Sequence, residues 1–196
     1  IPRFGMRKDT MDMPEAPTIQ VIACGVLAVD LKHVAHELGL NVALRFLPGG
    51  LHASPRELHA RLQETIDEIS AEAGVERIVL GYGVCGRGTV GLVARGTPLI
   101  IPRVHDCIAL FLGSDASYRE QFGHHPGTYY ISAGWVEEKG AEHGGRKMGS
   151  DGVEAPPDDA FRSMRQQYGS DNATYIRHFY DSWKRNYTRA AFIDTG

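Results

Sequence analysis

The sequence predicts an α/β fold of the doubly wound, Rossmann-like type, with a mainly parallel sheet of four to five strands and a C-terminal helical extension. Short β-branched apolar runs alternate with segments in which apolar residues recur at helical spacing. The runs are apolar on both sides, as is typical of parallel strands that helices cover on both faces. With 196 residues, 42% of them hydrophobic, the chain can bury such a core.

The first elements follow in strand–helix order. Residues 18–24 (TIQVIAC) are predicted as the first strand, and residues 26–39 as a helix that Gly39 ends. Residues 41–48 (NVALRFLP) form the second strand. Ser54 as N-cap and Pro55 at the first helical position then announce a second helix. Its apolar stripe consists of Leu58, Leu62, Ile66, Ile69 and Ala73.

The pattern continues through the middle of the chain. Residues 75–83 (VERIVLGYG) are predicted as the third strand and residues 88–96 as a short helical turn. A fourth strand is expected over residues 97–104, a helix over residues 107–123, and a fifth strand of the same sheet over residues 127–135 (GTYYISAGW). Parallel strands joined by helices require right-handed crossovers.

We predict four segments along the chain. Residues 1–17 are polar and form a flexible arm, and residues 18–135 form the α/β metal-binding domain. Residues 136–160 are rich in glycine and charge, which predicts a loop or lid. Residues 161–196 are predicted as helices with aromatic faces, which would cover the sheet or another subunit, so that a homodimer is reasonable.

Composition and charge exclude several classes of partner. The net charge of −3 comes without a basic stripe, which argues against nucleic acid and favours a small-molecule ligand. No apolar stretch is long enough to span a bilayer, and the first residues lack the apolar core of a signal peptide. The three cysteines, an odd number, fit a reducing compartment. We therefore expect a cytoplasmic protein that contacts no membrane.

Reactive side chains follow each of the first four predicted strands. Because ligands of open parallel sheets bind at the carboxyl ends of the strands, we expect these side chains to meet at one edge. The six residues are Cys24, His52, Cys85, His105, Asp106 and Cys107.

The three cysteines predict a metal site at this edge. Three thiolates without a fourth suggest a [4Fe–4S] cluster with one iron left open, or zinc that a histidine completes or that stays open to substrate. The chain has no C-x-x-C motif, so ferredoxin and zinc-ribbon patterns are excluded. The alternative is that Cys24, Cys85 and Cys107 are plain core residues, since free cysteine is often buried.

The other candidates have catalytic or binding roles. His105 or His52 would move a proton, and Asp106 would either orient that histidine or cap the following helix. Arg87 and Arg103 would bind a substrate carboxylate or phosphate, or pair with acids on the rim.

Glycines around the same edge would let the backbone approach a ligand. Gly25 and Gly86 are the two that we expect to contact substrate. The glycine-rich stretch GYGVCGRGTVG lacks the Gly-Lys-Ser/Thr of a phosphate-binding loop, so a nucleotide site is not predicted there. Tyr82 and Trp135 are expected in the core.

Several long segments resemble a prokaryotic family known as domain of unknown function 1638. They are IACG, LPGGLHASPREL, LGYGVCGRGTVGL, LIIPRVHDCIALFLGS and HPGTYYISAGWVE, and they cover about residues 18–136, with further similarity near the C-terminus. The resemblance implies the same six reactive residues at these positions. It also implies an association with trimethylamine-methyltransferase-like and corrinoid systems of one-carbon metabolism. Arg87 departs from the family pattern, in which asparagine is expected.

Three functions are compatible with these residues. The leading hypothesis is a metalloenzyme, a transferase, lyase or hydrolase that acts on a small methylated or sulfur-containing compound, such as a methylamine. The second is a non-catalytic, metal- or corrinoid-carrying accessory partner of a methyltransferase. The third is a metal-free thiol enzyme with Cys85 or Cys107 as nucleophile and His105 as base.

Overall fold

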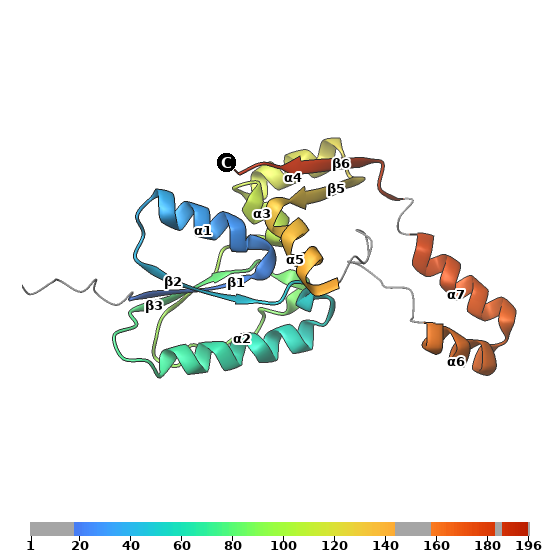
Figure 1. Cartoon of the computed structure of the whole chain (residues 1–196), viewed down its shortest axis with the longest axis horizontal. Coiled ribbons are helices and arrows are strands. Elements are labelled where there is room, and N and C mark those ends of the chain that lie inside the picture. Colours follow the sequence, from blue (N-terminus) through green and yellow to red (C-terminus); the bar gives the residue numbers. More distant parts are fainter. Residues whose placement is uncertain (1–17, 144–157, 183–185, 196) are drawn as a thin grey trace, which may run out of the picture.

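A four-stranded parallel sheet forms the centre of the protein in the computed structural model, which describes residues 18–143, 158–182 and 186–195 (Figure 1). The strands lie in the order β2-β1-β3-β4. They are β1 (Ile19–Cys24), β2 (Val42–Leu47), β3 (Arg77–Gly81) and β4 (Leu99–Ile100). The predicted α/β class is therefore confirmed. The predicted arm, residues 1–17, lies outside the described residues.

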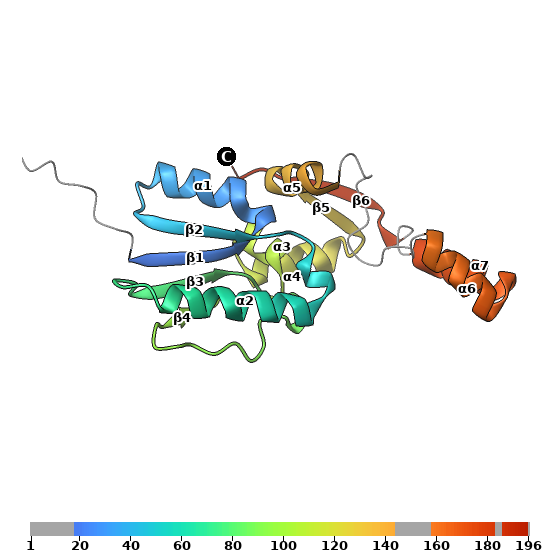
Figure 2. The ribbon, with the colours of Figure 1, turned by 60° about the horizontal axis from the view of Figure 1, so that its bottom comes forward.

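Two helices cover this sheet from opposite sides. Figure 1 shows α1 (Ala28–Glu37) above the sheet and α2 (Pro55–Ser70) below it, and Figure 2 shows the same layers from another side. A 3-10 turn, η1 (Gly25–Leu27), leads from β1 into α1. Pro55 starts α2 as predicted, although the Ser54 side chain makes no capping hydrogen bond.

The core lies between α2 and the sheet, as four of the five predicted stripe residues require; the fifth, Ala73, follows the end of α2 and is exposed. Leu58, Leu62, Ile66 and Ile69 of α2 are fully buried, together with Ile22, Ile78 and Leu80 of the strands. Each such side chain contributes about 1.5–3 kcal/mol relative to an exposed position. This packing fixes the carboxyl ends of β1 and β3, where the reactive residues begin.

Two predicted helices differ from the structure. The helix expected over residues 107–123 is divided into α3 (Cys107–Phe111) and α4 (Asp115–His124). Gly113 between them has a φ of +79°, and the Ser114 side chain caps α4 by accepting a hydrogen bond from the Ser117 backbone. The helical turn predicted over residues 88–96 is absent: a 3-10 turn, η3 (Cys85–Arg87), precedes this segment, which itself forms a turn over residues 88–91 and then an irregular connection.

The predicted fifth strand belongs to a different sheet. β5 (Thr128–Ser132) pairs in parallel with β6 (Arg189–Ile193), at the end of the described chain. The expectation that β5 would extend the main sheet was therefore wrong, and so was the expectation of helix throughout residues 161–196. The Thr195 hydroxyl donates a hydrogen bond to Asp30 of α1, which ties this strand to the main unit.

A helix occupies part of the segment predicted as a loop. α5 (Ala133–His143) follows β5 directly and packs against η1, where Gly134 lies so close to the Val26 carbonyl oxygen that a side chain would collide with it. This contact is made by a glycine, so it needs no apolar side chain on the helix. The rest of the predicted lid, residues 144–157, lies outside the described residues.

The predicted helical extension is present before β6. α6 (Asp158–Tyr168) and α7 (Ser170–Ser182) lie side by side, away from the main sheet in Figures 1 and 2. Among the described residues, none of the helices combines the length and apolar character that crossing a lipid bilayer requires.

Candidate functional site

A cavity of about 490 Å³ lies at the carboxyl ends of the main strands. Its size is within the range of small-molecule sites, which is about 300–1,000 Å³. Cys24, Cys85 and Cys107 all line it, although they come from three distant parts of the sequence. The structure therefore brings together the three side chains that were predicted to share one site.

Each cysteine is placed by the end or the beginning of an element. Cys24 is the last residue of β1 and is only 9% exposed. Cys85 begins η3, shortly after β3, and Cys107 begins α3. The three cysteines are the only ones in the chain, and they form no disulfide.

Backbone contacts join the segments that carry Cys85 and Cys107. The amide of Val84 donates to the carbonyl of Val104, and the amide of Cys85 donates to that of His105, both at 3.1 Å. Gly83 permits this approach, because a Cβ there would lie 2.7 Å from the Asp106 nitrogen and 2.8 Å from the Val104 oxygen. Residues 83–85 and 104–106 are therefore held together backbone to backbone beside the cavity, and we call this contact the joint.

The backbone of η3 is strained. Cys85, Gly86 and Arg87 have consecutive φ values of +44°, +62° and +76°. For the two residues with side chains, a left-handed conformation costs about 1–3 kcal/mol each. Such strain is concentrated at functional sites in proteins, and here it orients the turn that carries Cys85 at the cavity wall.

Burial and nearby negative charge raise the pKa values of two of the three thiols. Burial raises the pKa of the Cys107 thiol, and negative charge on Cys24, Cys85 and Asp106 raises it further. Burial likewise raises the pKa of Cys85, partly offset by a backbone hydrogen bond at Gly83. Without a cation, Cys85 and Cys107 are therefore neutral thiols at neutral pH, whereas a metal ion would deprotonate them.

The predicted histidines and Asp106 also line the cavity. His52, in the 3-10 turn η2 (Leu51–Ala53), and His105 are both exposed, so they lie at the mouth. Asp106 caps α3: its Oδ1 atom accepts hydrogen bonds from the backbone of Ile108 at 3.0 Å and of Ala109 at 3.3 Å. These contacts correspond to the capping alternative for Asp106.

The four predicted substrate-binding residues fall into two groups. Arg87 and Gly86 line the cavity, and both are exposed. Arg103 is exposed and is not among the lining residues. Gly25, next to Cys24, is not among them either, because the Glu138 carboxylate of α5 lies against it.

Glu138 is a residue that the sequence analysis missed. Its Oε1 atom accepts a hydrogen bond from the Gly49 backbone, so its carboxylate lies beside both Gly25 and Gly49. Glu138 also contributes to the raised pKa of Tyr82, after burial and the cysteines Cys24 and Cys85. The residue was missed because its segment was predicted as a loop, and one carboxylate among many charged residues in a loop does not indicate a functional site.

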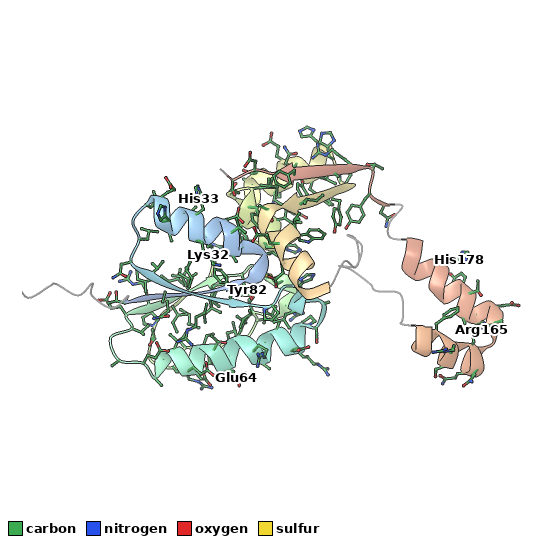
Figure 3. The ribbon with its side chains drawn as sticks, viewed as in Figure 1. Lys32, His33, Glu64, Tyr82, Arg165 and His178 are labelled. Carbon is green, nitrogen blue, oxygen red and sulfur yellow. The ribbon has the colours of Figure 1, made fainter. Side chains whose placement is uncertain are left out.

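The second sheet supplies an aromatic wall that was also not predicted. Tyr129 of β5 makes edge-to-face contacts with Trp135 at 5.8 Å and with Tyr187 at 5.1 Å between ring centroids. Tyr130 and Tyr82 also line the cavity. Figure 3 labels Tyr82, which follows β3 directly. Its expected core position is confirmed, since it is 3% exposed, but it faces the cavity as well.

The three thiols that line the cavity match some requirements of a metal site but not others. Thiolates suit zinc and iron–sulfur clusters, and three of them line one cavity. Within the described part of the chain, however, no three Cys, His, Asp or Glu side chains are placed close enough to share a single ion. The donor set thus fits thiolate-bound metals in chemistry, while its spacing is not that of a closed mononuclear site.

One comparison with known proteins finds a relationship. The model of a family described as "Protein of unknown function (DUF1638)" matches residues 46–196. The matched segment includes Cys85, Cys107 and both strands of the second sheet, whereas Cys24 precedes it. The chain has no match among curated proteins and none among solved structures.

Proposed function

Because the chain belongs to the DUF1638 family, whose description assigns no activity, we propose a function from the cavity itself. The protein is a metal-dependent enzyme in which Cys24, Cys85 and Cys107 hold a [4Fe–4S] cluster, with zinc as the alternative metal. Its substrate is a small methylated or sulfur-containing compound. The observation that supports this proposal is the convergence of three cysteines from separate elements on one cavity.

The position of the cavity supports a ligand site of this kind. We propose that the α/β unit is of the doubly wound, Rossmann-like type, in which ligands bind where the strand order reverses. In the order β2-β1-β3-β4, that point lies between β1 and β3. Cys24 ends β1 and Cys85 follows β3, so both thiols lie beside this crevice.

The spacing of the thiols favours a cluster over a single ion. Sulfur atoms that share one zinc ion lie about 3.8 Å apart, given Zn–S bonds of about 2.3 Å and tetrahedral angles. Cys24 and Cys85 are near enough to raise the pKa of Cys107, but the described cysteines are not placed for one ion. A cluster of several metal and sulfide atoms accepts more widely spaced ligands, and its open iron would act as a Lewis acid toward substrate.

The thiol environment also disfavours the metal-free alternative. A cysteine nucleophile needs a lowered pKa, whereas burial raises the pKa of both Cys85 and Cys107. His52 and His105 lie at the mouth of the cavity, where they can exchange a proton between substrate and water. Three cysteines that form no disulfide fit a reducing compartment, so we propose a cytoplasmic location.

A metal analysis tests the proposal. Protein purified without oxygen should contain iron in the ratio of a [4Fe–4S] cluster and show its broad visible absorption. Cys24→Ser, Cys85→Ser and Cys107→Ser should each lose the metal, because the three thiols share it. Ser54→Ala is the control, since the Ser54 side chain makes no capping bond. Stoichiometric zinc would identify the alternative metal, and neither iron nor zinc would contradict the proposal.

A second candidate function is supported by the C-terminal helices. α6 and α7 lie away from the sheet, and Tyr175 on α7 is 73% exposed. Such a surface is suited to docking, which favours an accessory role beside a methyltransferase or corrinoid protein, or a homodimer. A stable complex that leaves small molecules unchanged would support this role, whereas turnover by the isolated chain would contradict it.

A further inference from the structure

Two glycines at the ends of neighbouring strands make room for the carboxylate of Glu138. Gly25 follows β1 and Gly49 lies shortly after β2. A Cβ at Gly25 would lie 2.5 Å from the carboxyl carbon of Glu138, and a Cβ at Gly49 would lie 2.8 Å from its Cγ. Neither glycine has a positive φ, so the backbone conformation does not require glycine at either position. The space left by the two missing side chains, which we call the cradle, is therefore filled by a carboxylate.

The cradle adjoins the cavity that the three cysteines line. The residues on both sides of each glycine line this cavity, whereas the glycines themselves, which Glu138 covers, do not. These flanking residues are Cys24, Val26, Pro48 and Gly50. A carboxylate in the cradle thus lies next to the residue that follows Cys24, one of the proposed metal ligands.

The contacts of Glu138 in the cradle are weak enough to be exchanged. Its Oε1 atom accepts a hydrogen bond from the Gly49 amide, and among the described side chains no cation forms an ion pair with it. The Glu138 side chain is half-buried and belongs to α5, outside the main sheet. A carboxylate that lacks a dedicated counter-charge can give up its place to another carboxylate and move into water.

We propose that the cradle binds the carboxylate group of the substrate, and that Glu138 occupies it in the ligand-free protein. The inference rests on the proposed function, because it makes the substrate of the three-cysteine site a small methylated or sulfur-containing carboxylic acid. From the cradle, the rest of such a compound extends past Cys24 into the cavity in which the metal is proposed.

The proposed metal does not disfavour an anionic substrate at this position. One carboxylate replaces another, so the substrate exerts no more repulsion on metal-bound thiolates than Glu138 does in the ligand-free protein. Arg87, His52 and His105, which carry or can carry positive charge, line the same cavity. Positive groups at the mouth of a cavity attract anions toward it.

Titration of the full chain, loaded with its metal, with (methylthio)acetate tests the inference. Glu138→Ala removes the internal competitor, so by calorimetry or NMR it should bind this acid at least about 10-fold more tightly than the parent does, as expected for release of one hydrogen bond to a charged group. The uncharged (methylthio)acetamide should bind Glu138→Ala more weakly than the acid does. Glu137→Ala removes the same charge from an exposed neighbour on α5 and should bind as the parent does.

A double variant separates recognition of a carboxylate from a structural role of Glu138. The three atoms nearest to a Cβ at Gly49 all belong to Glu138, the third at 3.4 Å, so Gly49→Ala meets only ordinary contacts once Glu138→Ala has removed them. The new methyl group narrows the cradle, and the 10-fold gain of Glu138→Ala should be lost. If Glu138→Ala does not fold, Glu138→Gln replaces it. Its amide oxygen can still accept from Gly49 but competes less strongly, so the acid should again bind more tightly than to the parent.

Three results would overturn the inference. They are undetectable binding of (methylthio)acetate to the Glu138 variants, equal affinity of these variants and the parent for the acid, and an undiminished gain in the double variant. Metal content, measured on the same samples, separates the two proposals. A parent protein with iron or zinc retains the three-cysteine site even if the cradle does not recognise the acid, whereas a parent with neither metal contradicts the proposed function even if Glu138→Ala shows the gain.

Discussion

Gly83→Ala tests whether the joint between residues 83–85 and 104–106 brings Cys85 and Cys107 into the cavity. A Cβ at this position would lie 2.7 Å from the Asp106 nitrogen, 2.8 Å from the Val104 oxygen and 2.9 Å from the Asp106 Cα. All three are backbone atoms, which cannot rotate away as a flexible side chain would. The two segments must therefore separate to accept the methyl group.

The expected loss of stability in Gly83→Ala follows from the contacts between the two segments. Separation breaks the two backbone hydrogen bonds of 3.1 Å, each with a net value of about 0.5–1.5 kcal/mol. Overpacking of a tight contact adds about 1–3 kcal/mol. We expect the free energy of unfolding in urea to fall by about 2–6 kcal/mol, the sum of both effects. Bound metal should decrease as well, because Cys85 moves relative to Cys107.

Gly123→Ala is the matched control. Gly123 lies in α4, and nothing lies within 4 Å of the position its Cβ would take. Alanine is the better helix former, so stability should stay equal or rise by up to about 1 kcal/mol. If Gly83→Ala keeps its metal and unfolds within about 0.5 kcal/mol of the parent, as an ordinary surface substitution would, the joint does not position the thiols.

Two further predictions concern charge at the same place. Asp106→Ala should lower the free energy of unfolding by about 1 kcal/mol through loss of the α3 cap, whereas Asp106→Asn should retain most of it. An equal loss in both variants would contradict the capping role. In the metal-free protein, the raised pKa values of Cys85 and Cys107 mean that the folded state holds its protons longer than the unfolded state. Stability should therefore be fully present below the ordinary thiol pKa of 9.0 and should fall as the pH rises above it. Urea midpoints at about pH 7 and about pH 10 check this sign, and a flat profile would mean that the thiols are not buried as described.

The main sheet could be predicted because its signals are local. Four residues of the stripe predicted for α2, Leu58, Leu62, Ile66 and Ile69, are fully buried. The fifth, Ala73, lies beyond the end of the helix at Ser70 and is exposed. The strand-end rule placed Cys24 and Cys85 at one edge, because the side of a parallel sheet at which each strand ends follows from chain direction alone. Predicting these features does not require knowing which strands pair across long stretches of sequence.

The second sheet could not be predicted for the opposite reason. β5 has the composition of a strand, but composition does not say which strand it pairs with, and its partner β6 lies far along the chain. β6 is short, and it follows segments with clear helical periodicity, which favoured helix for the whole region. α5 contacts η1 through Gly134, which has no side chain, and such a contact adds nothing to the apolar stripe by which most helices are identified from sequence.

The consequence is that sequence patterns revealed the wall of the cavity that carries the reactive groups but not the wall that faces them. Cys24 ends β1, and Cys85 and Cys107 begin η3 and α3, which follow β3 and β4 along the chain. On the facing wall, Tyr130, Trp135 and Ile193 come from β5, α5 and β6. Both walls border the same cavity, and burial raises the pKa of Cys85 and of Cys107 there. These two thiols are therefore neutral in the metal-free state, and a bound cation would favour their ionisation. A strand near the C-terminus thus lines the same cavity as reactive residues that lie far before it in the sequence.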